Sequence, residues 1–215
     1  MKKTLAIIIA MMPLLAATAQ ISHSPQGNTD EKAEVVLKHA AAQFDNNVVF
    51  SLKATMVDAE KKTVAEHSAQ VFYNKGRYRL TMPELEVISN GKTVWQWNRQ
   101  ASEVIVSDVG TDDIDPLNPG QLLAGYSQAF RAKYIRTEND GTAIIDLQPR
   151  SARQFHKIRL MIDEKSGHLR RMEVHRYDGS RELYTIIGFK KTNTPDRVFT
   201  FDPTQHRGVE VIDMR

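Results

Sequence analysis

Ser127 is the residue of this chain that comes closest to a catalytic nucleophile. The segment Gly125-Tyr126-Ser127-Gln128-Ala129 differs at one position from the Gly-x-Ser-x-Gly nucleophile elbow of serine hydrolases. That elbow needs a strand before the serine and a helix after it, which together expose the hydroxyl. The spacing of apolar residues before Ser127 already predicts a helix. We therefore expect that this protein is not an enzyme. A secreted hydrolase of the esterase type remains a less favoured alternative.

Acidic and histidine side chains are the candidates for metal binding. Asp108, Asp112, Asp113 and Asp115 form an acidic cluster, but the cluster lacks the glycine at position six and the glutamate at position twelve of a calcium loop. The seven histidines show no recognised ligand spacing such as HExxH, and the sequence has no glycine-rich phosphate loop. We expect a solvated acidic turn, with no metal and no cofactor.

The strongest pattern in the chain is an alternation of apolar and polar residues along short runs. It predicts half-buried antiparallel strands, because successive side chains of a strand point to opposite faces. Within each run the large apolar residues share one side: Phe50, Leu52 and Met56; Tyr78, Leu80 and Met82; Trp95 and Trp97. All of these except the two methionines are predicted to line one concave face.

Turn residues separate the runs. Asn90-Gly91 lies between two apolar runs and predicts a hairpin with a type I′ turn, because both residues tolerate the positive φ that this turn requires. Asp140-Gly141, Ser166-Gly167 and Asp178-Gly179 occur at hairpin spacing further along the chain. The pattern predicts about eleven strands without a long helical crossover. This order favours an antiparallel meander that curls into a barrel-like sheet.

Two segments have helical spacing instead. Apolar residues between Ala33 and Phe44 recur at i, i+3, i+4 and i+7, which predicts an amphipathic helix from about Thr29 to Asp45 with Asn28 as its N-cap. A second helix is predicted over Gln121–Arg131, with an apolar side formed by Leu122, Leu123, Tyr126 and Phe130. A helix inserted between strands must rest on a face of the sheet or cover its opening.

The first residues have the three parts of a secretory signal peptide. Lys2 and Lys3 precede an apolar run from Leu5 to Ala17, and Ala17-Thr18-Ala19 is a small-x-small cleavage site. We predict cleavage after Ala19 and one mature domain over residues 20–215. The sequence contains no cysteine, so it offers neither a site for a lipid anchor on cysteine nor a disulfide.

The charge balance argues against nucleic-acid binding. Removal of Lys2 and Lys3 lowers Lys+Arg from 29 to 27 against 26 Asp+Glu, so the mature net charge is about +1. The span from Arg150 to Arg181 is nevertheless basic, with nine Lys and Arg against four Asp and Glu. Outward strand faces are usually charged, so this span is either a solvated face or a docking patch for an acidic partner.

Several features together resemble the periplasmic outer-membrane lipoprotein carrier family (LolA-like). They are the first helix, the strand before Lys75-Gly76, the hairpin Asn90-Gly91-Lys92-Thr93-Val94-Trp95, the inserted helix, Leu147-Gln148-Pro149, and the ending Phe199-Thr200-Phe201-Asp202-Pro203 with Gly208–Asp213. Their order and spacing carry the resemblance. One position departs from the family, which commonly has Arg-Pro where this chain has Asn74-Lys75.

The resemblance implies an unclosed β-barrel whose hydrophobic hollow is covered by the two helices as a lid. It implies a monomeric periplasmic carrier that receives the acyl chains of lipoproteins from an inner-membrane lipoprotein-releasing transporter and delivers them to an outer-membrane receptor. The ligand-binding residues would be Phe50, Leu52, Met56, Tyr78, Leu80, Met82, Trp95, Trp97, Leu122, Leu123, Tyr126 and Phe130.

Two expectations follow from details of the resemblance. In the family the arginine that corresponds to Asn74 braces the closed lid, so lid locking here should be weaker or use other residues. Tyr78 matches an aromatic position near the cavity mouth, so Tyr78→Glu is expected to leave the fold intact and to impair cargo binding.

A lipid-sensing module of the cell envelope is an alternative function, although such proteins usually carry a further domain.

Overall fold

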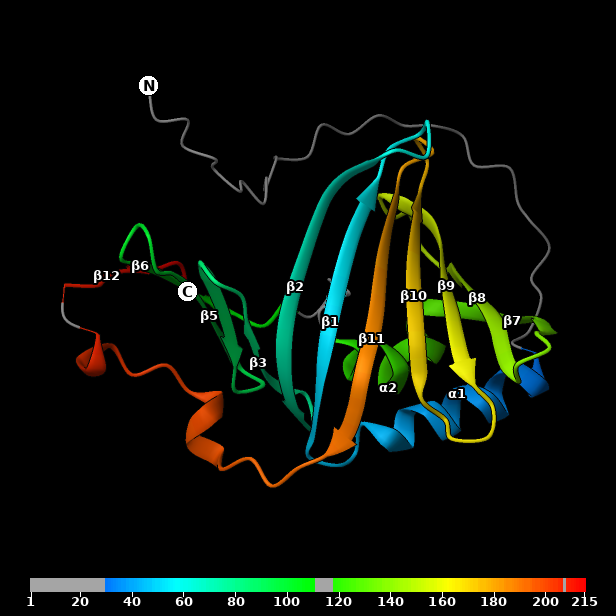
Figure 1. Cartoon of the computed structure of the whole chain (residues 1–215), viewed down its shortest axis with the longest axis horizontal. Coiled ribbons are helices and arrows are strands. Elements are labelled where there is room, and N and C mark those ends of the chain that lie inside the picture. The colour runs from blue at the N-terminus through cyan, green and yellow to red at the C-terminus, as the bar shows by residue number, and fades with distance from the viewer. Residues whose placement is uncertain (1–29, 111–117, 207) are drawn as a thin grey trace.

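The computed structural model describes residues 30–110, 118–206 and 208–215, and it shows one curved sheet with two helices on one side (Figure 1). Neither α1 (Glu31–Gln43) nor α2 (Pro119–Ala129), the α-helices of the described residues, has the length and apolar character needed to cross a membrane. Two short 3₁₀ helices follow late in the chain, η1 (Asp196–Phe199) and η2 (Pro203–Gln205). The strands are β1 (Val48–Val57), β2 (Thr63–Asn74), β3 (Arg77–Thr81), β4 (Leu85–Ser89), β5 (Thr93–Asn98), β6 (Glu103–Asp108), β7 (Phe130–Thr137), β8 (Thr142–Pro149), β9 (Phe155–Asp163), β10 (Leu169–Arg176), β11 (Arg181–Lys191) and β12 (Glu210–Asp213).

The order of the strands keeps the two edges of the sheet apart. From edge to edge it is β12-β6-β5-β4-β3-β2-β1-β11-β10-β9-β8-β7. Two antiparallel meanders, β1 to β6 and β7 to β11, meet where β1 pairs with β11. β12 and β7 form separate edges on opposite sides of the view in Figure 1. The prediction of a mainly β, unclosed antiparallel sheet with two helices is therefore confirmed.

One strand is not predicted from the sequence. β12 runs parallel to β6, with Glu210 opposite Glu103 and Asp213 opposite Val106. All four of its side chains are exposed, so it lacks the alternation of buried residues that identifies a strand in a sequence. The described sheet consequently has twelve strands, one more than the predicted eleven.

The helices begin and end near their predicted bounds, with different caps. Asp30, not Asn28, is the N-cap of α1, and its carboxylate accepts a hydrogen bond from the Lys32 backbone N–H at 2.9 Å. Asn118 caps α2 in the same way through the Gln121 N–H at 3.1 Å. α2 ends before Phe130, which is extended and begins β7. The predicted helix over Gln121–Arg131 was therefore two residues too long at its end.

The hairpin at Asn90-Gly91 forms, but its turn is not the predicted type I′. The backbone bond from Asn90 N to Thr93 O (3.2 Å) places Gly91 and Lys92 at the centre of the turn, and of these two Gly91 alone has a positive φ, at 87°. The Asn90 side chain accepts hydrogen bonds from the N–H groups of Lys92 and Thr93 at 2.9 and 2.8 Å. This local bonding by the asparagine competes with the backbone conformation assumed in the prediction.

The sheet has two differently covered faces. On the helix face, the side chains of β1, β3 and β8 to β10 pack in one core with those of α1 and α2. On the outer face, a second and smaller core lies under the C-terminal segment (residues 199–209). It consists of Ile88, Val104 and Phe201, with Trp95, Trp97 and Val209 packed against them.

The strand register decides which face receives the two tryptophans. Ile88 of β4 pairs with Arg79 of β3 and with Trp95 of β5. Because Arg79 and Tyr78 are consecutive in a strand, their side chains point to opposite faces. Trp95 and Trp97 therefore lie on the outer face and Tyr78 on the helix face. The prediction that the tryptophans share a concave face with the other apolar residues is wrong.

We expect Trp97→Ala to release the C-terminal segment without disturbing the helix face. The Trp97 ring lies 5.7 Å from the Phe201 ring and 4.1 Å from the His206 ring, between centroids. Truncating a packed aromatic residue costs about 3–5 kcal/mol when it is fully buried, and less for a half-buried residue such as this one. Hydrogen exchange of residues 199–213 should accelerate. Tyr177→Ala is the control, since that side chain is 71% exposed, and equal protection of 199–213 in both variants would contradict the expectation.

Candidate functional site

The helix face gathers most of the side chains that the sequence pointed to. Phe50, Leu52, Tyr78, Leu80, Leu122, Leu123, Tyr126 and Phe130 all belong to its core, and Met82 packs against its margin. The alternation of β1 and β3 and the helical spacing of α2 thus identified one continuous apolar surface. Whether this surface binds a ligand is not decided by its geometry, so the binding role of these residues stays a prediction.

An aromatic cluster at one end of this face was not singled out from the sequence. The ring of Phe44, the C-cap of α1, packs edge-on against Phe50 and Tyr73, at centroid distances of 6.2 and 5.4 Å. Phe189 of β11 stacks on Phe50 at 5.8 Å. The four rings come from the C-cap of α1 and from β1, β2 and β11. Their approach depends on strand pairing between distant parts of the chain, which no local pattern shows.

The two helices pack directly on the apolar face. Leu122, Leu123 and Tyr126 of α2 are buried, as are Leu37 and other residues of α1. Burying one leucine side chain stabilises the packed state by about 1.5–3 kcal/mol, and each methylene group of an acyl chain contributes about 0.8 kcal/mol. A few buried methylenes can therefore offset one displaced leucine.

Tyr73 and Gly120 form a close contact between the sheet and the first turn of α2. A Cβ atom built on Gly120 would lie 2.2 Å from the Tyr73 hydroxyl oxygen, so α2 approaches the ring as closely as it does because residue 120 is glycine. The hydroxyl accepts a hydrogen bond from the Gly76 N–H at 2.8 Å, and burial raises the pKa of Tyr73 to about 12. Asn74 and Lys75, the positions at which the sequence is expected to depart from the family, follow Tyr73 directly. The contact of Tyr73 with Gly120 is therefore one that holds α2 against the sheet in this chain.

Neither α-helix of the described residues covers the far end of the helix face. β1 and β2 extend beyond both helices in Figure 1, and Met56 near the end of β1 is 40% exposed. The Cα partner of Met56 is Glu182, which forms an ion pair with Arg176 and accepts a hydrogen bond from the Tyr184 hydroxyl at 2.7 Å. The face thus passes from a dry core to a polar border. This arrangement suits an amphiphile with an apolar chain and a polar head.

The catalytic and metal-binding alternatives are not supported where the structure describes their residues. Ser127 is exposed within α2, and its carbonyl oxygen accepts a hydrogen bond from the Arg150 Nε at 3.2 Å. The residues before it are helical, so it is not on the strand-to-helix turn that a nucleophile elbow needs. Of the acidic cluster, Asp108 is described at the end of β6, and Asp112, Asp113 and Asp115 lie outside the described residues.

Known proteins resemble this chain in sequence and in fold. Residues 74–202 match the family described as outer membrane lipoprotein carrier protein LolA. The outer-membrane lipoprotein carrier protein of Shewanella sediminis is 30% identical over 146 residues, which cover 66% of this chain and 64% of that protein. The protein of the same name from Haemophilus influenzae (strain KW20/Rd) is 28% identical over 137 residues, 63% of each. The chain thus spans somewhat less than two thirds of the length of these relatives.

A solved structure shows the same fold at low sequence identity. An uncharacterized conserved protein from Thermus thermophilus superposes with a TM-score of 0.58 at 12% identity, over 85% of this chain and 99% of that one. This likeness concerns the fold alone. The sequence match to the family covers more than half of the chain, including β3 to β11 and the inserted helix α2. The protein belongs to the LolA outer membrane lipoprotein carrier family.

Proposed function

We propose that this protein is a periplasmic carrier that shields the acyl chains of lipoproteins on its helix face. The observation that supports this proposal most is the apolar helix face, found in a chain that belongs to a lipoprotein carrier family. It is covered by two helices that apolar side chains hold in place, and it is open at the end near Met56.

The proposed carrier function requires binding that can be reversed. α2 is the element proposed to exchange between two positions, packed on the sheet when empty and displaced when cargo is bound. Since each displaced large side chain is energetically comparable to a few acyl methylenes, the several acyl chains of a lipoprotein can offset the displacement of α2. A ligand shifts such an equilibrium by its difference in affinity for the two positions. α1, which contacts α2, is proposed to complete the lid.

The proposed location and partners rest on the sequence and the family. Residues 1–19 are proposed to direct export and to be removed, so the N-terminus of the exported protein should be Gln20, which N-terminal sequencing would check. An inner-membrane lipoprotein-releasing transporter is proposed to load the carrier, and an outer-membrane receptor to accept the cargo. Both partners are proposed by analogy with the relatives named as outer-membrane lipoprotein carriers.

Mass spectrometry of material that co-purifies with the exported protein tests the function. We expect acyl chains attached to lipoprotein, released only when the complex is denatured. Recovery of free phospholipid alone would favour a lipid-sensing module, and recovery of no acylated species would contradict the carrier. Ser127→Ala is expected to leave cargo binding unchanged. An ester-cleaving activity that this variant abolishes would instead establish a hydrolase.

A further inference from the structure

The fold gathers basic side chains on one part of the outer face. Strand pairing places cations along the outer face of β7 to β11, where Arg136 and Lys190 lie in register with the outward-pointing Ile144 and Val49. Six further cations have such a neighbour: Arg131, Lys133, Lys157, Arg159, Arg171 and Arg181. Four of these six belong to the basic span identified in the sequence, and two come from β7. Positive charge is therefore concentrated on this part of the surface, although the net charge of the whole chain is close to zero.

Two carboxylates of this surface are buried beneath the cations, and a third, Asp163, forms an ion pair with Arg170. The Asp146 carboxylate accepts hydrogen bonds from Arg159 Nε and Nη2 at 2.7 and 2.8 Å and from Lys157 Nζ at 3.3 Å. Glu173 lies 3.2 Å from Arg171 Nε and 3.3 Å from His175 Nε2. Asp146 and Glu173 are each 7% exposed. Solvent therefore meets mainly cationic groups, because the eight cations outnumber Asp146, Glu173 and Asp163, the carboxylates that the described strands place on this face.

The ionisation of the buried groups fits this account. Burial by itself would raise the pKa of Asp146, but the hydrogen bonds and charges of Arg159 and Lys157 outweigh it and lower that pKa. Asp146 is therefore charged at neutral pH. Burial and the nearby Lys157 lower the pKa of His175, so that histidine is neutral and adds no charge of its own.

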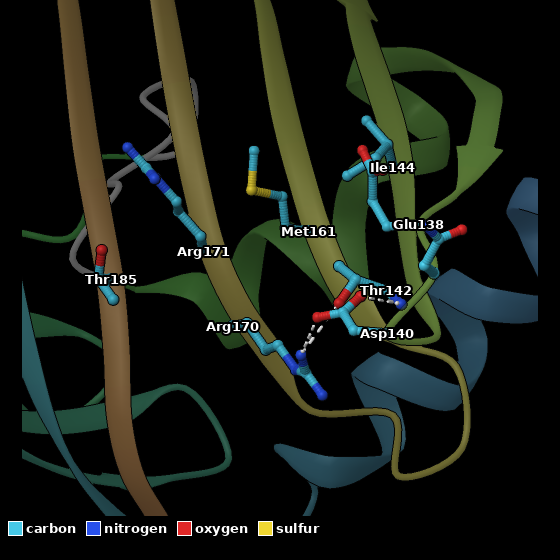
Figure 2. Close-up of a pocket in the computed structure, with 9 residues that line it drawn as sticks. Glu138, Asp140, Thr142, Ile144, Met161, Arg170, Arg171 and Thr185 are labelled. Atoms are coloured by element: carbon cyan, nitrogen blue, oxygen red, sulfur yellow. Dashed lines mark hydrogen bonds and ion pairs between the residues drawn. The ribbon is translucent and has the colours of Figure 1, made fainter.

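Apolar side chains lie among the cations. Ile187 of β11 is exposed, and Leu183 and Met161 are half-buried on the same face. Beside Arg171 the surface is hollowed by a shallow groove of about 540 Å³, where Met161 lies next to Arg171, Ile144 lies beyond Met161, and the Arg170–Asp140 ion pair also lines the groove (Figure 2). The groove offers a cationic group next to apolar surface. An anionic group attached to an apolar chain has the matching chemistry.

We propose that the outer face of β7 to β11 docks on membrane surfaces that contain anionic lipids. Neighbouring strands are about 4.8 Å apart, so the cations cover roughly 19 Å across five strands, and each Lys or Arg near such a surface adds to the attraction. Basic residues mixed with apolar ones are typical of membrane-surface binding. The inference is carried by the charges of this face and does not depend on what the helix face binds.

Flotation with lipid vesicles tests the proposal on the purified full chain. The protein should float with phosphatidylcholine vesicles that contain phosphatidylglycerol, and not with phosphatidylcholine alone. Lys133→Gln with Arg181→Gln should weaken this binding about fivefold for each charge removed, or about 25-fold together. The matched control, Lys92→Gln with Lys165→Gln, removes the same net charge from exposed turns outside this face and should bind like the unmodified protein. Raising the salt concentration should weaken binding.

Several results would overturn the proposal. One is flotation with neither kind of vesicle, and another is equal binding to both kinds. A third is an equal loss of vesicle binding in the two double variants, which would mean that net charge alone determines binding. Binding to poly-glutamate without binding to vesicles would identify an acidic protein partner instead. Cargo loading measured on the same variants separates this inference from the proposed function. Loading should be normal even where docking is lost, and a protein that docks without carrying lipoprotein would contradict only the carrier proposal.

Discussion

Gly120→Ala should loosen α2 from the sheet and speed cargo exchange, whereas Gly125→Ala on the same helix should not. The added methyl group at residue 120 would lie 2.2 Å from the hydroxyl oxygen and 2.4 Å from the Cζ of Tyr73, so the ring or the helix must move. The ring is held by its edge-on contact with Phe44, and we expect α2 to yield. Overpacking of this kind costs about 1–3 kcal/mol.

Gly125→Ala is a matched control, because a Cβ atom at residue 125 would meet nothing within 4 Å. It should stabilise α2 by up to about 1 kcal/mol through helix propensity. Hydrogen exchange of α2 should therefore shift in opposite directions in the two variants. If about 1–3 kcal/mol is lost at the contact, the population with α2 displaced rises about 5–150-fold, and the exchange of bound lipoprotein should accelerate with it.

A second substitution distinguishes this contact from a general defect of the helix. Tyr73→Leu removes the atoms that the new methyl group would strike. Combined with Gly120→Ala, it should restore part of the protection of α2, because the effects of residues in contact are not additive. Strictly additive effects of the two substitutions, or unchanged protection in Gly120→Ala, would show that this contact does not hold α2.

Met56→Lys should abolish most cargo binding and leave the fold intact. Met56 lies on the apolar face and is 40% exposed, so a lysine there retains access to water and adds a charge to the proposed acyl path. Losing the apolar contact of one large side chain costs about 1.5–3 kcal/mol, which corresponds to a roughly tenfold or larger loss of affinity. Thr55→Lys is the control, because residue 55 points to the outer face. Equal lipoprotein loading of both folded variants would contradict the placement of the site.

Tyr78→Glu, which the sequence suggested, is not a suitable variant for testing where cargo binds. Tyr78 is 4% exposed within the core, and an unpaired carboxylate buried there would carry a penalty of several kcal/mol. The variant would report on folding rather than on the binding of cargo. Exposure at the open end of the sheet, which the sequence does not reveal, makes Met56 the better position.

The chain by itself determined the elements and the composition of their faces. Alternation along β1 and β3 and helical spacing in α1 and α2 are local properties, because a side chain's direction follows from its own backbone and that of its neighbours. Phe50, Leu52, Tyr78 and Leu80 could therefore be assigned to one apolar face from the sequence alone. The order of motifs likewise indicated the carrier family, which the match over residues 74–202 confirms.

Only the tertiary structure decided how the strands and helices meet. Trp95 and Trp97 alternate as clearly as Tyr78 and Leu80, but the register of β3, β4 and β5 turns them to the outer face. A shift of one residue in register exchanges the faces of a whole strand, and local spacing does not set that register. The Tyr73–Gly120 contact and the basic outer face likewise join residues far apart in the chain. Their energies depend on distances that exist only once the sheet has assembled.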